Sequence, residues 1–183
     1  WAKSPPTQAS SSATDVDLDG EDEYLLRNSR IFAVCEALGG RLVAAWVRDP
    51  SNAKAYQVVG NFQSYSGNET ETEGSTHNKG NQIDARRTSA FKDWWAAGPD
   101  TDYVNALYAA THTQGHGWTF TSPDGRITKT LLLQDNATEI QASYTLGQDV
   151  DRLYVRFGFS PNLEDLLLNG QAHLGDLIDD GSR

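Results

Sequence analysis

Six of the nine residues between positions 15 and 23 are acidic, at 15, 17, 19 and 21–23, and this spacing is suited to binding a metal ion. In a tightly curved loop, carboxylates at every second position converge on one point, and Gly20 at the sixth position permits the sharp turn. Hard oxygen ligands favour calcium over zinc or copper. The sequence therefore predicts a Ca²⁺ loop whose ligands come from Asp15, Asp17, Asp19, Glu21 and Glu23.

This loop differs from a full EF-hand. Position twelve is Leu26, where an EF-hand has a bidentate glutamate, and the flanking segments have the pattern of strands instead of helices. We therefore expect an ion that stabilises the fold and not a calcium sensor. The alternative is an acidic linker end that only solvates itself.

Aromatic residues gather after the acidic loop, around positions 91–103. Trp94 and Trp95, with Tyr103 nearby, are candidates for a carbohydrate-binding platform, because aromatic faces stack on the apolar faces of sugar rings. The alternative is that one or both tryptophans fill the edge of a core. Residues alternate between the two faces of a strand, so one ring can point inward and the other outward.

Two histidines, His112 and His116, stand near a predicted strand end, but a metal site needs at least one further ligand. Ordinary hydrogen bonding is the alternative role. Ser89, Asp93 and His112 contain the residue types of a catalytic triad, yet the chain has no Gly-x-Ser-x-Gly turn to present the serine. We predict no catalytic residue.

Asn68 and Asn136 each begin an Asn-x-Thr sequon and fall in predicted loops, where a glycan would be tolerated. They are candidate glycosylation sites of a secreted glycoprotein.

Short alternating or apolar runs separated by turn residues are typical of strands. Hairpin turns are expected at Gly39-Gly40, at 49–52, at 123–125 and at 134–136, since these residues tolerate turn conformations. The predicted strands are Glu23 to Leu26, Arg30 to Leu38, Arg41 to Asp49, Ala55 to Phe62, Val104 to His112, Gly117 to Ser122, Arg126 to Gln134, Thr138 to Leu146 and Arg152 to Ser160.

This pattern predicts an all-β fold, an antiparallel β-sandwich with one or two short helices, over residues 15–183. The helices are expected at Phe91 to Ala97, where a packed aromatic turn is the alternative, and at Asn162 to Leu168. Residues 1–14 are rich in Pro, Ser and Thr and are expected to form a solvated linker or arm. Residues 66–89 form a long polar excursion from the sheet.

The chain carries a formal net charge of -10, which argues against a nucleic-acid or anionic-membrane surface. No apolar stretch is long enough to span a bilayer. The single cysteine, Cys35, excludes an internal disulfide.

Residues 17–26, together with Asn28, the run 31–34 and the segment 39–42, resemble the start of the β-sandwich domain that follows the catalytic barrel in glycoside hydrolase family 57 and related α-glucan-active enzymes. In that group an acidic segment leads into two strands and a Gly-Gly hairpin. The resemblance covers about residues 15–60. It implies a supersandwich-like fold of the galactose-mutarotase type, without the catalytic carboxylates of the barrel.

The expected function is that of a non-catalytic, calcium-stabilised accessory or carbohydrate-binding domain of a secreted carbohydrate-active protein. Its partners would be a glycan or polysaccharide and other domains of a larger chain, outside the cell or at its surface. The alternative is a structural subunit or adhesion module of a filament or surface layer, whose N-terminal arm contacts neighbouring copies by adding to a sheet edge.

Overall fold

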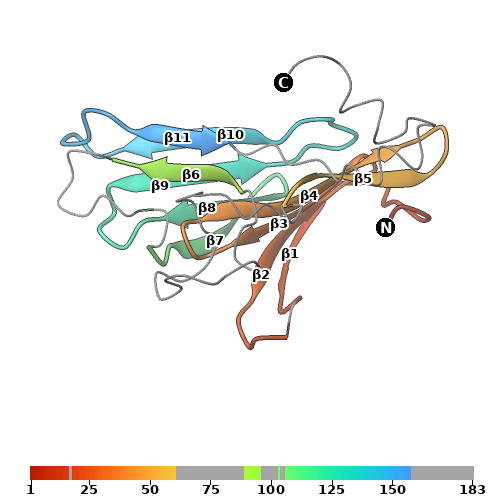
Figure 1. Cartoon of the computed structure of the whole chain (residues 1–183), viewed down its shortest axis with the longest axis horizontal. Coiled ribbons are helices and arrows are strands. Elements are labelled where there is room, and N and C mark those ends of the chain that lie inside the picture. The colour runs from red at the N-terminus through yellow and green to blue at the C-terminus, as the bar shows by residue number, and fades with distance from the viewer. Residues whose placement is uncertain (17, 61–88, 96–102, 104–105, 158–183) are drawn as a thin grey trace, which may run out of the picture.

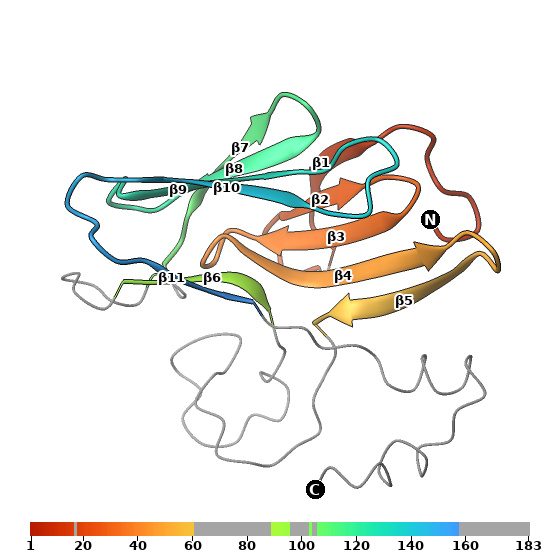
Figure 2. The ribbon, with the colours of Figure 1, turned by 90° about the horizontal axis from the view of Figure 1, so that it is seen from above.

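The computed structural model describes residues 1–16, 18–60, 89–95, 103 and 106–157, except for the side chains of Trp94 and Arg156. This part of the chain is all-β and contains two antiparallel sheets that pack as a sandwich (Figures 1 and 2). It contains no helix, and thus no helical segment able to cross a membrane. The predicted fold class is confirmed.

The larger sheet has seven strands in the order β1-β2-β3-β4-β6-β11, and β5 also pairs with β4. Strand β4 pairs with β3 on one edge and with two strands on the other, since Leu42 pairs with Ala90 of β6 while residues 45–49 pair with β5. The strands are β1 (Ser10–Thr14), β2 (Glu23–Arg27), β3 (Ile31–Glu36), β4 (Arg41–Asp49), β5 (Lys54–Val59), β6 (Ala90–Trp94) and β11 (Tyr154–Phe157).

The smaller sheet has four strands in the order β10-β9-β8-β7, which form a meander of sequential hairpins. It lies over the larger sheet in Figure 2. Its strands are β7 (Ala109–Thr113), β8 (Gly117–Thr121), β9 (Ile127–Leu132) and β10 (Gln141–Leu146).

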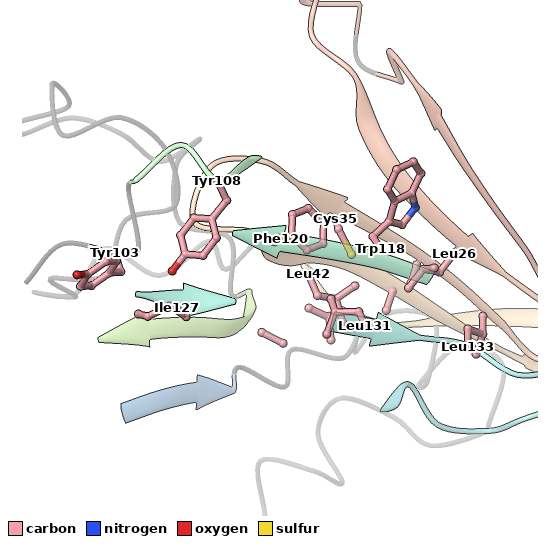
Figure 3. Close-up of a cluster of buried hydrophobic side chains, with 14 of the residues drawn as sticks. Leu26, Cys35, Leu42, Tyr103, Tyr108, Trp118, Phe120, Ile127, Leu131 and Leu133 are labelled. Carbon is pink, nitrogen blue, oxygen red and sulfur yellow. The ribbon is translucent and has the colours of Figure 1, made fainter. Parts of the chain in front are cut away.

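The core fills the space between the two sheets. Trp118, Phe120 and Leu131 of the smaller sheet face Leu26 and Leu42 of the larger one (Figure 3). All five side chains are buried, and Phe120 and Leu131 have no exposed surface. Burying an aliphatic or aromatic side chain of this size contributes about 1.5–3 kcal/mol, so these contacts hold the sheets together.

Strand β9 shows why the sequence forms this sandwich. Its burial alternates from Ile127 onward, with Ile127, Lys129 and Leu131 directed to the core and the intervening threonines partly exposed. A period of two places one face of a strand in the core. The core face of β9 thus includes one charged residue, Lys129.

All four predicted hairpin turns connect antiparallel neighbours. Gly39-Gly40 joins β3 to β4, and the turns at 49–52, 123–125 and 134–136 join β4 to β5, β8 to β9 and β9 to β10. Gly39, Gly40 and Gly125 have φ values of 69°, 52° and 71°, in the left-handed region that favours glycine.

Two expectations about the elements were wrong. Residues 90–94 form strand β6, where a short helix or aromatic turn was expected, and they pair with β11. Residues 10–14, expected to be a solvated part of a linker or arm, form strand β1 at the edge of the larger sheet and pair with β2. The expected helix at 162–168 and the polar excursion at 66–89 lie largely or wholly outside the described residues.

The residues before β1 are also held against the sheet. The ring centroids of Trp1 and Phe32 lie 5.9 Å apart, and the indole Nε1 of Trp1 donates a 2.7 Å hydrogen bond to the carbonyl of Asn28. Arg48 Nε donates to the carbonyl of Ala2 at 2.8 Å. The N-terminal segment is therefore part of the sandwich.

Candidate functional site

The acidic loop connects β1 to β2 and folds around the carboxylate of Asp15. Its Oδ1 accepts the amide of Leu18 at 2.6 Å and its Oδ2 accepts the amide of Gly20 at 3.1 Å. Gly20 has a φ of 95°, so the sharp turn predicted at this residue is present. Leu18 also has a positive φ, of 66°, and its side chain is 86% exposed.

The other described carboxylates of this loop differ in exposure. Asp19 and Glu21 are exposed, and Asp19 Oδ1 accepts the Glu21 amide at 2.8 Å. Glu23 is buried, and its Oε2 accepts the Val16 amide at 2.5 Å. Asp17 lies outside the described residues.

Among the described residues, no three acidic, histidine or cysteine side chains converge in the way a metal ion needs. Asp15 and Glu23 instead bind main-chain amides within the loop. The calcium site stays a prediction.

Two of the three residues of the predicted sugar platform are buried. Trp95 is 5% exposed and Tyr103 is 3% exposed, and both rings belong to the core. Trp95 Nε1 donates to Asp151 Oδ1 at 3.1 Å, and the Tyr103 hydroxyl donates to Asp124 Oδ2 at 2.6 Å. Neither ring offers a free face, and the side chain of Trp94 lies outside the described part.

The two histidines do not form a cluster with other ligands in the described part of the chain. His112 Nε2 is 2.7 Å from the hydroxyl of Ser11, and its ring packs edge-on against Trp118. His116 is exposed in the turn between β7 and β8. His112 thus links β7 to β1 by a hydrogen bond of the ordinary kind.

The described sequon lies where a loop was predicted. Asn136 is exposed in the turn between β9 and β10, with a φ of 55°, and its Oδ1 accepts a hydrogen bond from Ser29 at 2.6 Å. Its glycosylation stays a prediction. Asn68 lies outside the described residues.

A buried polar centre that sequence reasoning missed joins the two sheets. Lys129 on β9 and Asp93 on β6 are both fully buried, and Nζ of the lysine lies 2.6 Å from Oδ2 of the aspartate. The lysine Nζ also donates to the carbonyls of Gly39 at 2.8 Å and Phe91 at 2.7 Å. All three of its hydrogen-bond donors therefore have acceptors.

Two tyrosines complete this centre. The Tyr108 hydroxyl donates to Asp93 Oδ2 at 2.9 Å, and the Lys129 ammonium lies 5.0 Å and 5.9 Å from the ring centroids of Tyr108 and Tyr144. Within the described part, Asp93 Oδ1 and the Tyr144 hydroxyl are buried without a hydrogen-bond partner. A buried polar atom left unsatisfied costs about 1–3 kcal/mol.

Burial changes the proton affinities at this centre. It raises the pKa of the Tyr108 and Tyr144 hydroxyls, and the Asp93 carboxylate raises both further. Burial lowers the pKa of Lys129, against the opposing effect of Asp93. The thiol of Cys35 is buried beside the lysine, and its pKa rises to about 12, so it stays protonated.

One signal in the sequence could have identified half of this pair. A lysine at the centre of the alternating strand 127–132 stands on the same face as two aliphatic residues, and a buried lysine needs a partner. The partner could not be identified, because Asp93 was assigned to a helix or turn and not to a strand of the opposite sheet.

Searches for related proteins gave no match: no protein-family profile, no curated protein and no solved structure resembles the chain significantly. The functional argument therefore rests on this chain's own residues.

Proposed function

We propose that this chain is a non-catalytic β-sandwich module of a secreted carbohydrate-active protein, with Ca²⁺ bound by the acidic loop between β1 and β2. The module would act outside the cell or at its surface, beside other domains of a larger chain. It would hold a glycan or polysaccharide, with the ring of Trp94 as the candidate contact.

The observation that carries this proposal is the folded state of the acidic loop. Two main-chain amides bind the carboxylate of Asp15, and Gly20 makes the turn at the position that the ligand spacing requires. A loop that is already curved needs less ordering when an ion binds, which favours affinity. Calcium would offset the repulsion among the neighbouring carboxylates of the segment 15–23.

The order of the elements also supports the proposal of a β-sandwich module, although only at the level of fold class. The resemblance of residues 15–60 to the sandwich domain of α-glucan-active enzymes implies a sandwich in which an acidic segment leads into two strands and a Gly-Gly hairpin. In this chain the acidic loop is followed by β2, β3 and the turn at Gly39-Gly40, within two antiparallel sheets. The galactose-mutarotase type of supersandwich is the finer architecture that we propose.

The absence of catalysis is proposed from where the reactive groups lie. Asp93, which a triad would need, is fully buried and bound to Lys129 and Tyr108, while His112 binds Ser11. A substrate in solution cannot reach an enclosed carboxylate without opening of the sandwich.

Glycan-array binding tests the carbohydrate part of the proposal, with and without EDTA. The variant is Trp94→Ala alone, since replacing the buried Trp95 would also disturb the core. Leu146→Ala, an exposed residue of the other sheet, is the control. We expect the wild-type protein to bind a glycan on the array, Trp94→Ala to bind it more weakly, and the control to bind it as well as the wild type. Absence of glycan binding under every condition contradicts this part.

A second candidate function is that of a structural subunit or adhesion module. The ordered N-terminal segment favours it, because β1 shows that this segment can add a strand to a sheet edge. Exchange of β1 between copies would use the same pairing with β2. Sedimentation of the whole chain over a range of concentrations tests this, and a monomer at every concentration contradicts it.

A further inference from the structure

The pairing of Lys129 with Asp93 brings an amine and a carboxyl group together across the two sheets. Their charged atoms lie 2.6 Å apart with no solvent exposure on either side chain. A carboxyl C–O bond is about 1.2 Å long, so the carboxyl carbon Cγ lies within about 3.8 Å of Nζ. This is close to the distance of about 3–3.5 Å at which bound groups react.

The surroundings hold the two groups in this geometry. The carbonyls of Gly39 and Phe91 fix the Lys129 amine from two further directions. Gly40 leaves the space that the lysine chain occupies, since a Cβ atom built on Gly40 would lie 2.8 Å from Lys129 Cε. The amine therefore has little freedom to move away from Asp93.

The low polarity of the core penalises buried charge. Two buried charges lose their hydration, and their mutual attraction does not reliably repay that loss. Transfer of one proton from the ammonium to the carboxylate leaves a neutral amine and a carboxylic acid. The lowered pKa of Lys129, caused first by burial, acts in this direction.

We propose that Lys129 and Asp93 condense to form an isopeptide bond that joins β9 to β6. After the proton transfer, the lone pair of Nζ adds to Cγ of Asp93 and forms the C–N bond. A second proton passes from nitrogen to Oδ2, the Cγ–Oδ2 bond breaks, and one water molecule leaves. The product is a neutral secondary amide, with no change in oxidation state and no cofactor.

Each oxygen of Asp93 has a tyrosine suited to this reaction. The Tyr108 hydroxyl donates to Oδ2, the oxygen that leaves, and so draws electrons from the bond that breaks. Oδ1 becomes the amide oxygen and carries negative charge in the tetrahedral intermediate. The Tyr144 hydroxyl is buried with no hydrogen-bond partner in the described part, and burial and Asp93 raise its pKa, so we assign it as the donor to that oxygen.

The bond would be a covalent link between the two sheets. The chain has one cysteine, so it has no internal disulfide to serve that purpose. Like a disulfide, a link between positions 93 and 129 restricts the unfolded chain and opposes separation of the sheets. It also removes two buried charges from the core.

The intact mass of the full chain, measured after denaturation, tests the proposal. We expect the folded wild-type protein to be lighter than its sequence by one water molecule. Lys129→Arg removes the nucleophile and should restore the full mass, whereas the exposed-site control Lys54→Arg should keep the deficit. Tyr108→Phe should slow the appearance of the lighter species after refolding.

Peptide mapping distinguishes this bond from other losses of water. Asp-Gly sequences such as Asp19-Gly20 and Asp124-Gly125 can lose water within one peptide, but only an isopeptide bond connects the peptides that contain Asp93 and Lys129. A branched peptide of those two segments supports the proposal. The proposal is overturned if the folded wild-type protein has the full mass of its sequence. It is also overturned if the mass deficit maps to other peptides. Neither result depends on whether the variants fold.

Discussion

Gly40 lies against the side chain of Lys129, so closely that a Cβ atom built on the glycine would be 2.8 Å from Cε of the lysine and 2.9 Å from Cβ of Phe120. The Gly39-Gly40 turn thus does two things. It reverses the chain between β3 and β4, and it gives Lys129 both space and a carbonyl acceptor.

The first prediction follows from this contact. Gly40→Ala introduces the close contacts and also places alanine at a φ of 52°. Gly125→Ala is the matched control, because Gly125 has a φ of 71° but nothing within 4 Å of its Cβ position. We expect the control to lose about 1 kcal/mol of unfolding free energy and Gly40→Ala to lose about 1–3 kcal/mol more. Urea denaturation measures both; equal losses would contradict the account.

The second prediction concerns Asn28, which is fully buried and saturated with hydrogen bonds. Its Nδ2 donates to the carbonyls of Gln134 and Ala137, and its Oδ1 accepts the amides of Arg30 and Ile31. Asn28→Ala removes the acceptor of the buried Ile31 amide and three part-buried hydrogen bonds to the main chain, so we expect a loss of at least about 2 kcal/mol.

The control for Asn28 is Asn52→Ala, which removes a capping asparagine from the exposed turn between β4 and β5. Water can replace that bond, and the expected loss is below about 1 kcal/mol. Thermal denaturation compares the two variants. A smaller effect at position 28 than at position 52 would show that the described network does not hold the two sheets.

The third prediction concerns the N-terminal segment. Trp1 is half-buried against Phe32, and its indole donates to Asn28. Trp1→Ala should therefore destabilise the fold by about 1–2 kcal/mol, while Val16→Ala, at a residue that is 51% exposed, should change it little. If both variants have the melting temperature of the wild type, the N-terminal segment does not pack on the sheet as described.

Sequence reasoning identified the fold where local pattern was sufficient. The alternation in β9 and the glycines of the β3–β4 turn are determined within a few residues, and both were predicted correctly. Strand β1 was missed because Ser, Thr and Ala carry no apolar pattern, and its order comes from main-chain pairing with β2. Strand β6 was missed because Lys92 and Asp93 interrupt its apolar run, although both are buried.

The candidate sites depend more on long-range contacts. Tyr103 and Trp95 have the composition of a sugar platform, yet burial decides their role, and burial depends on the opposite sheet. Lys129 and Asp93 meet only because β9 and β6 face each other, which no local pattern encodes. The curvature of the loop at Gly20, in contrast, was predicted from spacing alone.

The fourth prediction concerns acid stability. Burial raises the pKa of Asp124, but hydrogen bonds from Ser122, Tyr103 and Arg126 outweigh burial and lower it to about 2. A carboxyl with a lowered pKa in the folded state contributes stability that is complete above its ordinary value of 3.8 and is lost as pH falls toward about 2.

Replacing this carboxyl should change how stability depends on pH in the acidic range. The Asp124→Asn variant should be less stable than the wild type at neutral pH, and the difference should shrink as pH falls from about 4 to about 2. Melting temperatures of both proteins, measured across that pH interval, check whether the difference shrinks as pH falls. A difference that stays constant with pH would show that Asp124 contributes by packing and not by its charge.

The fifth prediction tests the calcium loop by single charges. Asp19→Asn keeps the oxygen that accepts the Glu21 amide and removes only the charge of a predicted ligand. Asp22→Asn removes an exposed charge from the same segment at a position that is not a predicted ligand. An ion that binds the folded state alone adds about 2.7 kcal/mol of stability at a hundred times its dissociation constant. The first variant should lose a large part of this gain, and the second should keep most of it.

The most direct test of the proposed function is the melting temperature of EDTA-treated wild-type protein as free Ca²⁺ is increased. The account predicts a melting temperature that rises steadily with the logarithm of calcium concentration, with a smaller rise in Asp19→Asn. A melting temperature that does not change with calcium would contradict the claim that the loop between β1 and β2 is an ion site.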